Sequence, residues 1–149
     1  MLDIKKYDEE HLPGDNEKKE VVSFLYEHLD QYGDVEPDIE RSVDYSLNLR
    51  KSFGGFILTA TDDGKMLGAV VVNGTGMKGY IPENILVYIA THKDARGKGI
   101  GKKLMERAIS EANGDIALHV EPDNPARFLY EKYGFTNKYL EMRYKREKA

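Results

Sequence analysis

Two hydrophobic patterns alternate along this chain and predict its elements. Apolar residues return every three or four positions in four segments, as expected of helices with one buried face. These segments cover residues 15–33, 37–52, 99–112 and 124–134. Shorter segments rich in apolar and β-branched residues predict strands. They cover residues 2–7, 55–61, 66–73, 85–92, 115–121 and 135–145, the last as one or two strands. The order predicts one strand, two helices, a run of antiparallel strands, and then strands that alternate with helices.

The segments between the strands refine this order. Asp63-Gly64 lies between two strand segments, and this dipeptide favours a tight β-hairpin. Residues 75–84 make a glycine-rich loop, and loops of this length often have a function of their own. The segment 85–92, ILVYIATH, is almost continuously apolar, which predicts a central strand that is buried on both faces.

The composition is that of an ordinary soluble protein. The chain has 149 residues, 40% hydrophobic and 32% charged, so we predict one domain over residues 1–149. Its longest apolar run, residues 85–90, is far shorter than a membrane span, and the first residues lack the apolar core of a signal peptide. We therefore expect a cytoplasmic protein with no membrane partner.

Charge and cysteine content exclude several classes of function. The net charge of −4 argues against nucleic acid as a partner, because nucleic-acid binders usually present a basic face. The chain has no cysteine, which excludes disulfides, Cys-ligated zinc and thiol catalysis. Its four histidines lie on different predicted elements and no cluster has metal-ligand spacing, so we predict no metal.

The segment 94–104, DARGKGIGKKL, is the strongest candidate for chemistry. It joins a predicted strand to a predicted helix, where free backbone N–H groups and the helix dipole favour an anion. Its alternating glycines allow close approach of a ligand. The segment fails as a P-loop and as a dinucleotide fingerprint, because Lys102 stands where either motif needs a glycine. The sequence therefore predicts a phosphate-binding turn of another kind.

Two segments together carry a family resemblance. Arg96, Gly99 and Gly101 match the pattern Arg/Gln-x-x-Gly-x-Gly/Ala, and residues 124–135 read NPARFLYEKYGF. Both resemble motifs of the GCN5-related N-acetyltransferases, the GNAT superfamily. The resemblance implies an α/β fold of the α+β kind, the GNAT fold. Such a fold has a mixed, mostly antiparallel central sheet of six to seven strands flanked by about four helices.

The resemblance also implies a co-substrate and residues that hold it. The co-substrate is acetyl-CoA, whose pyrophosphate lies on the backbone amides of the glycine turn, with Arg96 shaping the turn and Lys102 adding charge. The pantetheine arm pairs with the strand before the turn, and Asn124 contacts the co-substrate or caps its helix. The implied binding residues are Ile89, Ala90, Thr91, Arg96, Gly97, Lys98, Gly99, Ile100, Gly101, Lys102 and Asn124.

For the chemistry, the resemblance implies direct transfer of the acetyl group to a primary amine. Tyr130 stands at the general-acid position and would protonate the leaving CoA thiolate. Glu83 resembles the catalytic glutamate of histone-type members, while His119, Glu121, Tyr88 and water remain alternative bases. A non-catalytic acyl-CoA-binding sensor or scaffold is the alternative function. The amine acceptor, a small molecule or a peptide or protein, stays open, and so does a homodimer.

Overall fold

The computed structural model describes residues 1–147. The chain divides into two compact units, Met1–Leu118 and His119–Ala149, and each is described by itself. No helix among the described residues is both long and apolar enough to cross a membrane.

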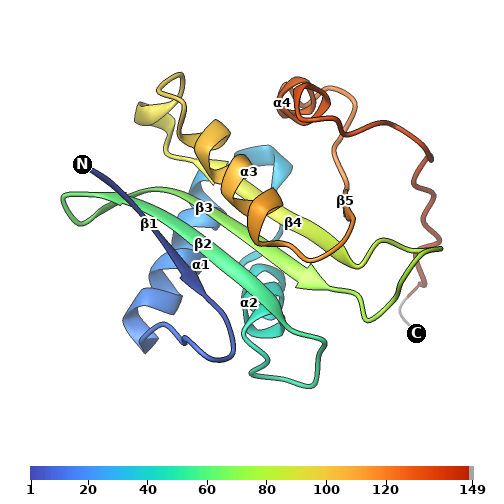
Figure 1. Ribbon diagram of the computed structural model, residues 1–149, viewed down its shortest axis with the longest axis horizontal. Helices are drawn as coiled ribbons and strands as arrows, with labels where there is room; N and C mark the ends of the chain where they lie inside the picture. Colours follow the sequence, from blue (N-terminus) through green and yellow to red (C-terminus); the bar gives the residue numbers. More distant parts are fainter. Residues whose placement is uncertain (148–149) are drawn as a thin grey trace. The chain divides into compact units, whose positions relative to one another are not determined.

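The first unit is built on one five-stranded sheet (Figure 1). Its strands are β1 (Leu2–Tyr7), β2 (Gly55–Asp62), β3 (Lys65–Gly74), β4 (Asn84–Thr91) and β5 (Ile116–Leu118), and they lie in chain order. The first four pair antiparallel, whereas β4 and β5 pair parallel. The mixed, mostly antiparallel sheet predicted from the sequence is therefore confirmed.

The hairpin between β2 and β3 forms where the sequence predicts it. Asp62 pairs with Lys65, so the loop consists of two residues. Asp63 and Gly64 have φ angles of 50° and 77°, and positive φ at both positions is the requirement of the tight turn that matches the twist of paired strands.

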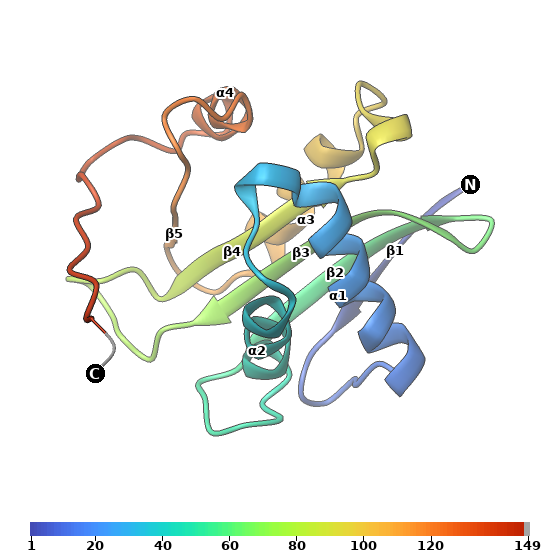
Figure 2. The ribbon, with the colours of Figure 1, turned by 180° about the vertical axis from the view of Figure 1, so that it is seen from behind.

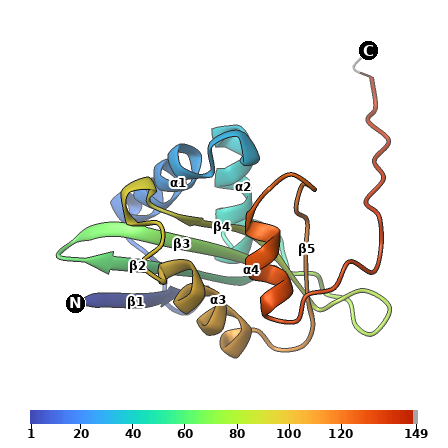
Figure 3. The same ribbon diagram turned by 90° about the horizontal axis from the view of Figure 1, so that it is seen from above.

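Helices cover both faces of this sheet (Figure 3). On one face lie α1 (Asp15–Leu29) and α2 (Glu36–Ser46), which Figure 2 shows in front of the strands. Their apolar residues join those of the sheet in one core that includes Leu25, Ile39 and Val71. The predicted second helix ends earlier than expected, at Ser46, because Asn48 takes a left-handed φ of 56°.

The opposite face of the sheet carries α3 (Ile100–Glu111), whose Leu104, Met105 and Ala108 are fully buried. This helix approaches β3 closely at Gly68. A Cβ added to Gly68 would lie 2.5 Å from Leu104 Cδ1. The small residue therefore lets α3 pack directly on the strand.

The second unit contains one helix, α4 (Ala126–Lys132), among its described residues. Asn124 Oδ1 accepts a hydrogen bond of 2.9 Å from the Ala126 N–H, which satisfies a donor at the start of the helix. Gly134 follows the helix with φ of 94°, as the sequence pattern predicts for a helix end.

The predicted number of strands is too high. The described residues form five strands instead of six to seven, since residues 135–145 form none. From residue 139 on their large apolar side chains are exposed, and Met142 is 90% accessible. An alternating apolar pattern predicts a strand only where a neighbouring strand and a core face are there to receive it. The predicted strand 115–121 is likewise shorter, at Ile116–Leu118.

Candidate functional site

Strand β4 has an open edge over more than half its length. Its parallel partner β5 pairs only with Asn84, Ile85 and Leu86. After Leu86, β3 is the only strand among the described residues that pairs with β4. The main-chain groups on the side away from β3 are therefore available to an extended ligand, in the manner of an added strand. The predicted pantetheine-binding residues, Ile89, Ala90 and Thr91, lie on this open edge.

The same strand contains an irregularity where it leaves β5. Val71 pairs with Tyr88 and Val72 pairs with Leu86, so Val87 is an extra residue in the ladder. Such a β-bulge bends the strand and increases its twist. Burial then alternates along β4 between buried and half-buried residues. The prediction of a strand buried on both faces is thus wrong, because every second residue of β4, from Ile85 to Thr91, is only half-buried.

The start of β4 is held by one side chain. Asn84 Nδ2 donates to the main-chain oxygens of Asn113, at 2.9 Å, and Asp115, at 3.2 Å. These bonds tie the loop after α3 to the beginning of β4. The two strands therefore start together and diverge toward the glycine turn.

The glycine turn itself has the backbone that the sequence predicts. Gly97 and Gly99 have φ angles of 84° and 80°, and a Cβ added at either would meet no atom within 4 Å. Gly99 is the residue before α3, and its carbonyl accepts from the Lys103 N–H. The N–H groups of the first residues of α3, Ile100 to Lys102, have no partner within the helix and carry the positive end of its dipole. The turn offers open, left-handed backbone and free donors to an anion.

Contacts with the end of α1 hold this turn in place. Arg96 Nη2 donates to the His28 carbonyl at 3.1 Å, and the Lys93 N–H donates to His28 Nδ1 at 3.2 Å. The rings of His28 and His92 lie 4.2 Å apart between their centroids. Burial, followed by the neighbouring His92 ring, lowers the pKa of His28, which favours the neutral ring that can accept from Lys93. Arg96 therefore anchors the turn through its guanidinium, while Lys98 and Lys102 remain exposed.

The predicted base Glu83 lies at the far end of β4. Its carboxyl group packs where a Cβ on Gly114 would be, and its main-chain oxygen accepts from the Thr75 N–H. It stands six positions before Ile89, which is roughly 20 Å along the strand at about 3.3 Å per residue. Two other candidates for the catalytic base, His119 and Glu121, are exposed and belong to the second unit.

Tyr88, the remaining candidate, has a partner that sequence reasoning missed. Its hydroxyl donates to Asp34 Oδ2 at 2.5 Å. Burial and the Asp34 carboxylate raise the pKa of the Tyr88 phenol well above its ordinary value, so Tyr88 keeps its proton. The two residues are 54 positions apart, and Asp34 stands in a turn-like segment where an acid is ordinary. Only the packing of the loop after α1 over β4 brings them together.

Tyr130 lies on α4 in the second unit and is only 8% exposed. Burial raises the pKa of its phenol to about 12. Its ring meets that of Phe135 edge to face, with centroids 6.1 Å apart. A tyrosine in this state is protonated at neutral pH and can act only as a proton donor.

Two grooves lie beside α2. The first, of about 650 Å³, runs between α2, the end of β3, the loop after it and the start of β4. It is called the sheet-end groove below and is lined by Arg41, Ser42, Tyr45, Asn73, Gly74, Thr75, Met77, Ile81, Ile85 and Val87.

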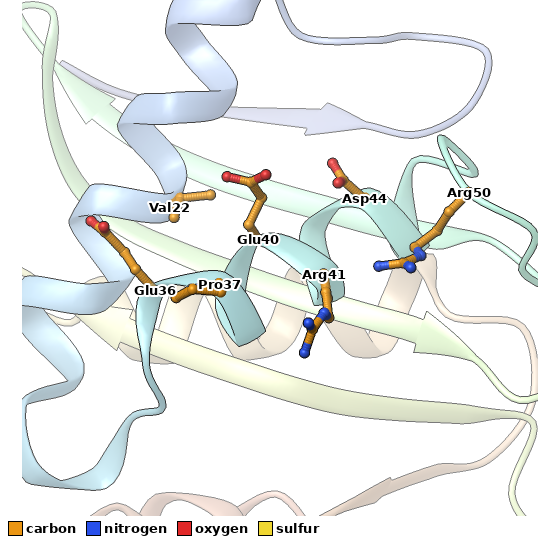
Figure 4. Close-up of a pocket in the computed structure, with 7 residues that line it drawn as sticks. All are labelled: Val22, Glu36, Pro37, Glu40, Arg41, Asp44 and Arg50. Carbon is orange, nitrogen blue, oxygen red and sulfur yellow. The ribbon is translucent and has the colours of Figure 1, made fainter.

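The second groove, of about 420 Å³, lies between α1 and α2 and includes no residue of the sheet. Figure 4 shows Glu36, Glu40 and Asp44 along it, on one side of α2, with Arg41 pointing the other way. No group of three potential metal ligands occurs among the described residues.

An open strand edge followed by a left-handed glycine turn at a helix N-terminus places the chain among α/β proteins with an anion-binding backbone geometry at the end of a central strand. Within that class, the chain belongs to the GNAT family, because the family model described as an acetyltransferase (GNAT) domain matches residues 54–137. The family resemblance read from the two sequence motifs is thereby confirmed.

Individual relatives agree with this assignment. The chain is 31% identical over 121 residues to an acetyltransferase of Pectobacterium atrosepticum, covering 76% of this chain and 77% of the relative. It is 32% identical over 84 residues to the 5-NmdU N-acetyltransferase of Pseudomonas phage PaMx11, covering 55% of this chain and 58% of that enzyme. That match thus spans little more than half of the phage enzyme.

Among solved structures, a predicted acetyltransferase from Clostridium acetobutylicum, determined with acetyl-CoA, aligns with a TM-score of 0.67. The alignment covers 96% of both chains at 19% identity. At that identity the likeness establishes a shared fold, which confirms the predicted GNAT architecture.

Proposed function

We propose that this protein transfers the acetyl group of acetyl-CoA directly to a primary amine. The observation that carries the proposal is the left-handed glycine turn at the start of α3, directly after the open edge of β4. The turn supplies N–H donors for the pyrophosphate and the edge supplies main-chain partners for pantetheine. The acetyltransferase names of both relatives support the same activity.

The residues of the co-substrate site divide by role. Backbone N–H groups of Gly99, Ile100 and Gly101 hold the pyrophosphate, with Gly97 and Lys98 completing the turn and Lys102 adding charge. Residues 89–91 pair with pantetheine, and an N–H near Ile89 or Ala90 polarises the thioester carbonyl. Such a donor contributes about 3 kcal/mol to stabilising the oxyanion. For Asn124, the hydrogen bond that its side chain accepts from the Ala126 N–H supports capping of α4 as its role.

The reaction requires a proton to leave the amine and another to reach the thiolate. The amine nitrogen attacks the thioester carbon, its excess proton goes to a base, and the carbon–sulfur bond breaks as the sulfur takes a proton. We assign the last step to Tyr130. Its place in the motif and its buried, protonated phenol support this role.

Two carboxylates compete for the role of base. Glu83 is the choice by family resemblance, but it stands at the start of β4, six residues before Ile89. Asp34 is held by the hydroxyl of Tyr88, the residue next to Ile89. We assign the role of base to Asp34, whose carboxylate is held in position by Tyr88. Asp34 is the better choice because it lies over the part of β4 where the thioester would bind.

The test of the function measures binding and turnover separately. Calorimetry should show one acetyl-CoA per chain, and free CoA should appear when primary amines are added to the protein with acetyl-CoA. Binding without CoA release from any amine would identify a non-catalytic acyl-CoA-binding domain instead. Stabilisation by ATP greater than that by acetyl-CoA would contradict both.

A further inference from the structure

We propose that the acceptor is an amine attached to an apolar or aromatic body, with no second cationic group, and that this body binds in the sheet-end groove. The proposal rests on the proposed acetyl transfer and names the class of acceptor. It is argued from the position of the groove, its lining and the placement of charge around α2.

The groove opens beside the reacting part of β4. Val87, the bulge residue, lines it, and two residues further along the strand is Ile89, at the proposed thioester site. Two residues of strand span about 7 Å. An acceptor seated against Val87 can therefore extend its amine to the thioester. The groove volume, about 650 Å³, suits a small molecule or one peptide residue with its neighbours.

The apolar part of the lining comes from two elements. Ile85 and Val87 project from β4, and Met77 and Ile81 come from the loop before it. Met77 and Ile81 are 46% and 40% exposed, so apolar surface faces water there. Covering such surface favours an apolar ligand.

The polar residues of the lining have hydrogen-bond partners within the protein. The Tyr45 hydroxyl donates to the Gly74 carbonyl at 2.6 Å, and the Ser42 hydroxyl donates to the main chain of its own helix. The Thr75 hydroxyl donates to the Pro82 carbonyl at 2.7 Å. These hydroxyl donors are already used, so apart from the Arg41 guanidinium and the Asn73 amide the groove offers a ligand mainly hydrocarbon surface.

Charge around α2 disfavours a polycation in this groove. Residues four apart share one face of a helix, and the acids Glu36, Glu40 and Asp44 follow that spacing. They line the second groove and point to one side of α2, whereas Arg41, which lines both grooves, points to the other side (Figure 4). The lining of the sheet-end groove includes Arg41, whose guanidinium donates to Asp38 Oδ1 at 2.8 Å, and it includes no carboxylate. Spermidine-like and aminoglycoside acceptors need several acidic partners, but the lining itself has none and the nearby Asp38 carboxylate is already paired with Arg41.

The experiment measures amine binding to the CoA-saturated protein by calorimetry, with CoA release recorded for the same amines. Phenethylamine and tryptamine represent the proposed class, and spermidine and kanamycin represent polycations. Ile81→Glu introduces a carboxylate into the groove, and Tyr80→Glu is the matched control, since Tyr80 is 81% exposed on the same loop and outside the lining.

We expect phenethylamine to bind the wild-type protein at least about tenfold more tightly than spermidine, as a well-fitted apolar pocket allows. Ile81→Glu should weaken phenethylamine binding at least about tenfold, whereas Tyr80→Glu should change it less than about twofold. Tighter binding of spermidine by the wild type, or an unchanged affinity in Ile81→Glu, would overturn the proposal.

The two readouts separate this inference from the proposed function. Apolar amines that bind in the groove without any release of CoA would support the groove assignment and reject acetyl transfer. CoA release with polycations alone would support acetyl transfer and reject the apolar acceptor.

Discussion

Replacing Gly99 by Asp tests the phosphate-binding turn directly. Gly99 precedes α3 with φ of 80°, and an added Cβ would meet no atom within 4 Å. The aspartate therefore brings no steric overlap within the protein, but it places a carboxylate beside the N–H groups proposed for the pyrophosphate. At about 5 Å and an effective dielectric constant of about 20 to 80, two like unit charges repel by roughly 1 to 3 kcal/mol. We expect acetyl-CoA to bind roughly fivefold to 150-fold more weakly.

Gly79 provides a matched control for this substitution. It also has φ of 80° with nothing within 4 Å of an added Cβ, and it lies in the loop before β4. A left-handed backbone costs a non-glycine residue about 1 to 2 kcal/mol at either position. The eight residues of β4, roughly 26 Å at about 3.3 Å each, separate Gly79 from the glycine turn. Gly79→Asp should therefore destabilise the fold about as much as Gly99→Asp does, but it should leave the affinity for acetyl-CoA unchanged.

The assay is titration calorimetry with acetyl-CoA at low and at high salt, together with thermal unfolding of both variants. Because salt screens exposed charges, the difference between the variants should shrink at high ionic strength. If both variants fold and Gly99→Asp binds acetyl-CoA within about twofold of Gly79→Asp, the argument for a backbone phosphate cradle is wrong.

Three further outcomes are expected. Tyr130→Phe should retain acetyl-CoA affinity and lose about a hundredfold in kcat. Because burial raises the pKa of Tyr130 to about 12, deprotonation of this group should not lower the wild-type rate between pH 7 and 10. Full turnover by the Phe variant at every pH would contradict the acid role. Asp34→Asn should lower kcat at least about tenfold, whereas Glu83→Gln should not. The reverse pattern would identify Glu83 as the base. Gly68→Ala should lower the free energy of unfolding, measured in urea, by about 1 to 3 kcal/mol, because the added Cβ would lie 2.5 Å from Leu104 Cδ1. An unchanged midpoint of urea unfolding would show instead that α3 can shift to make room.

Local sequence alone determined most elements of this protein and the turn that begins α3. Helix periodicity, the Asp63-Gly64 hairpin and the left-handed glycines at 97 and 99 depend on neighbours in the chain, so patterns a few residues long predict them. The family resemblance rests on the same kind of local signal, namely the spacing of glycines around one helix start.

Only the tertiary structure decided the features that depend on residues far apart in the chain. Strand β4 is open from residue 87 because β5 ends after three pairs, and residues 135–145 form no strand because no partner pairs with them. The contact of Asp34 with Tyr88 and the lining of the sheet-end groove join segments separated by dozens of residues. Such contacts depend on how helices pack on the sheet, and this packing leaves no short-range pattern from which they could have been read.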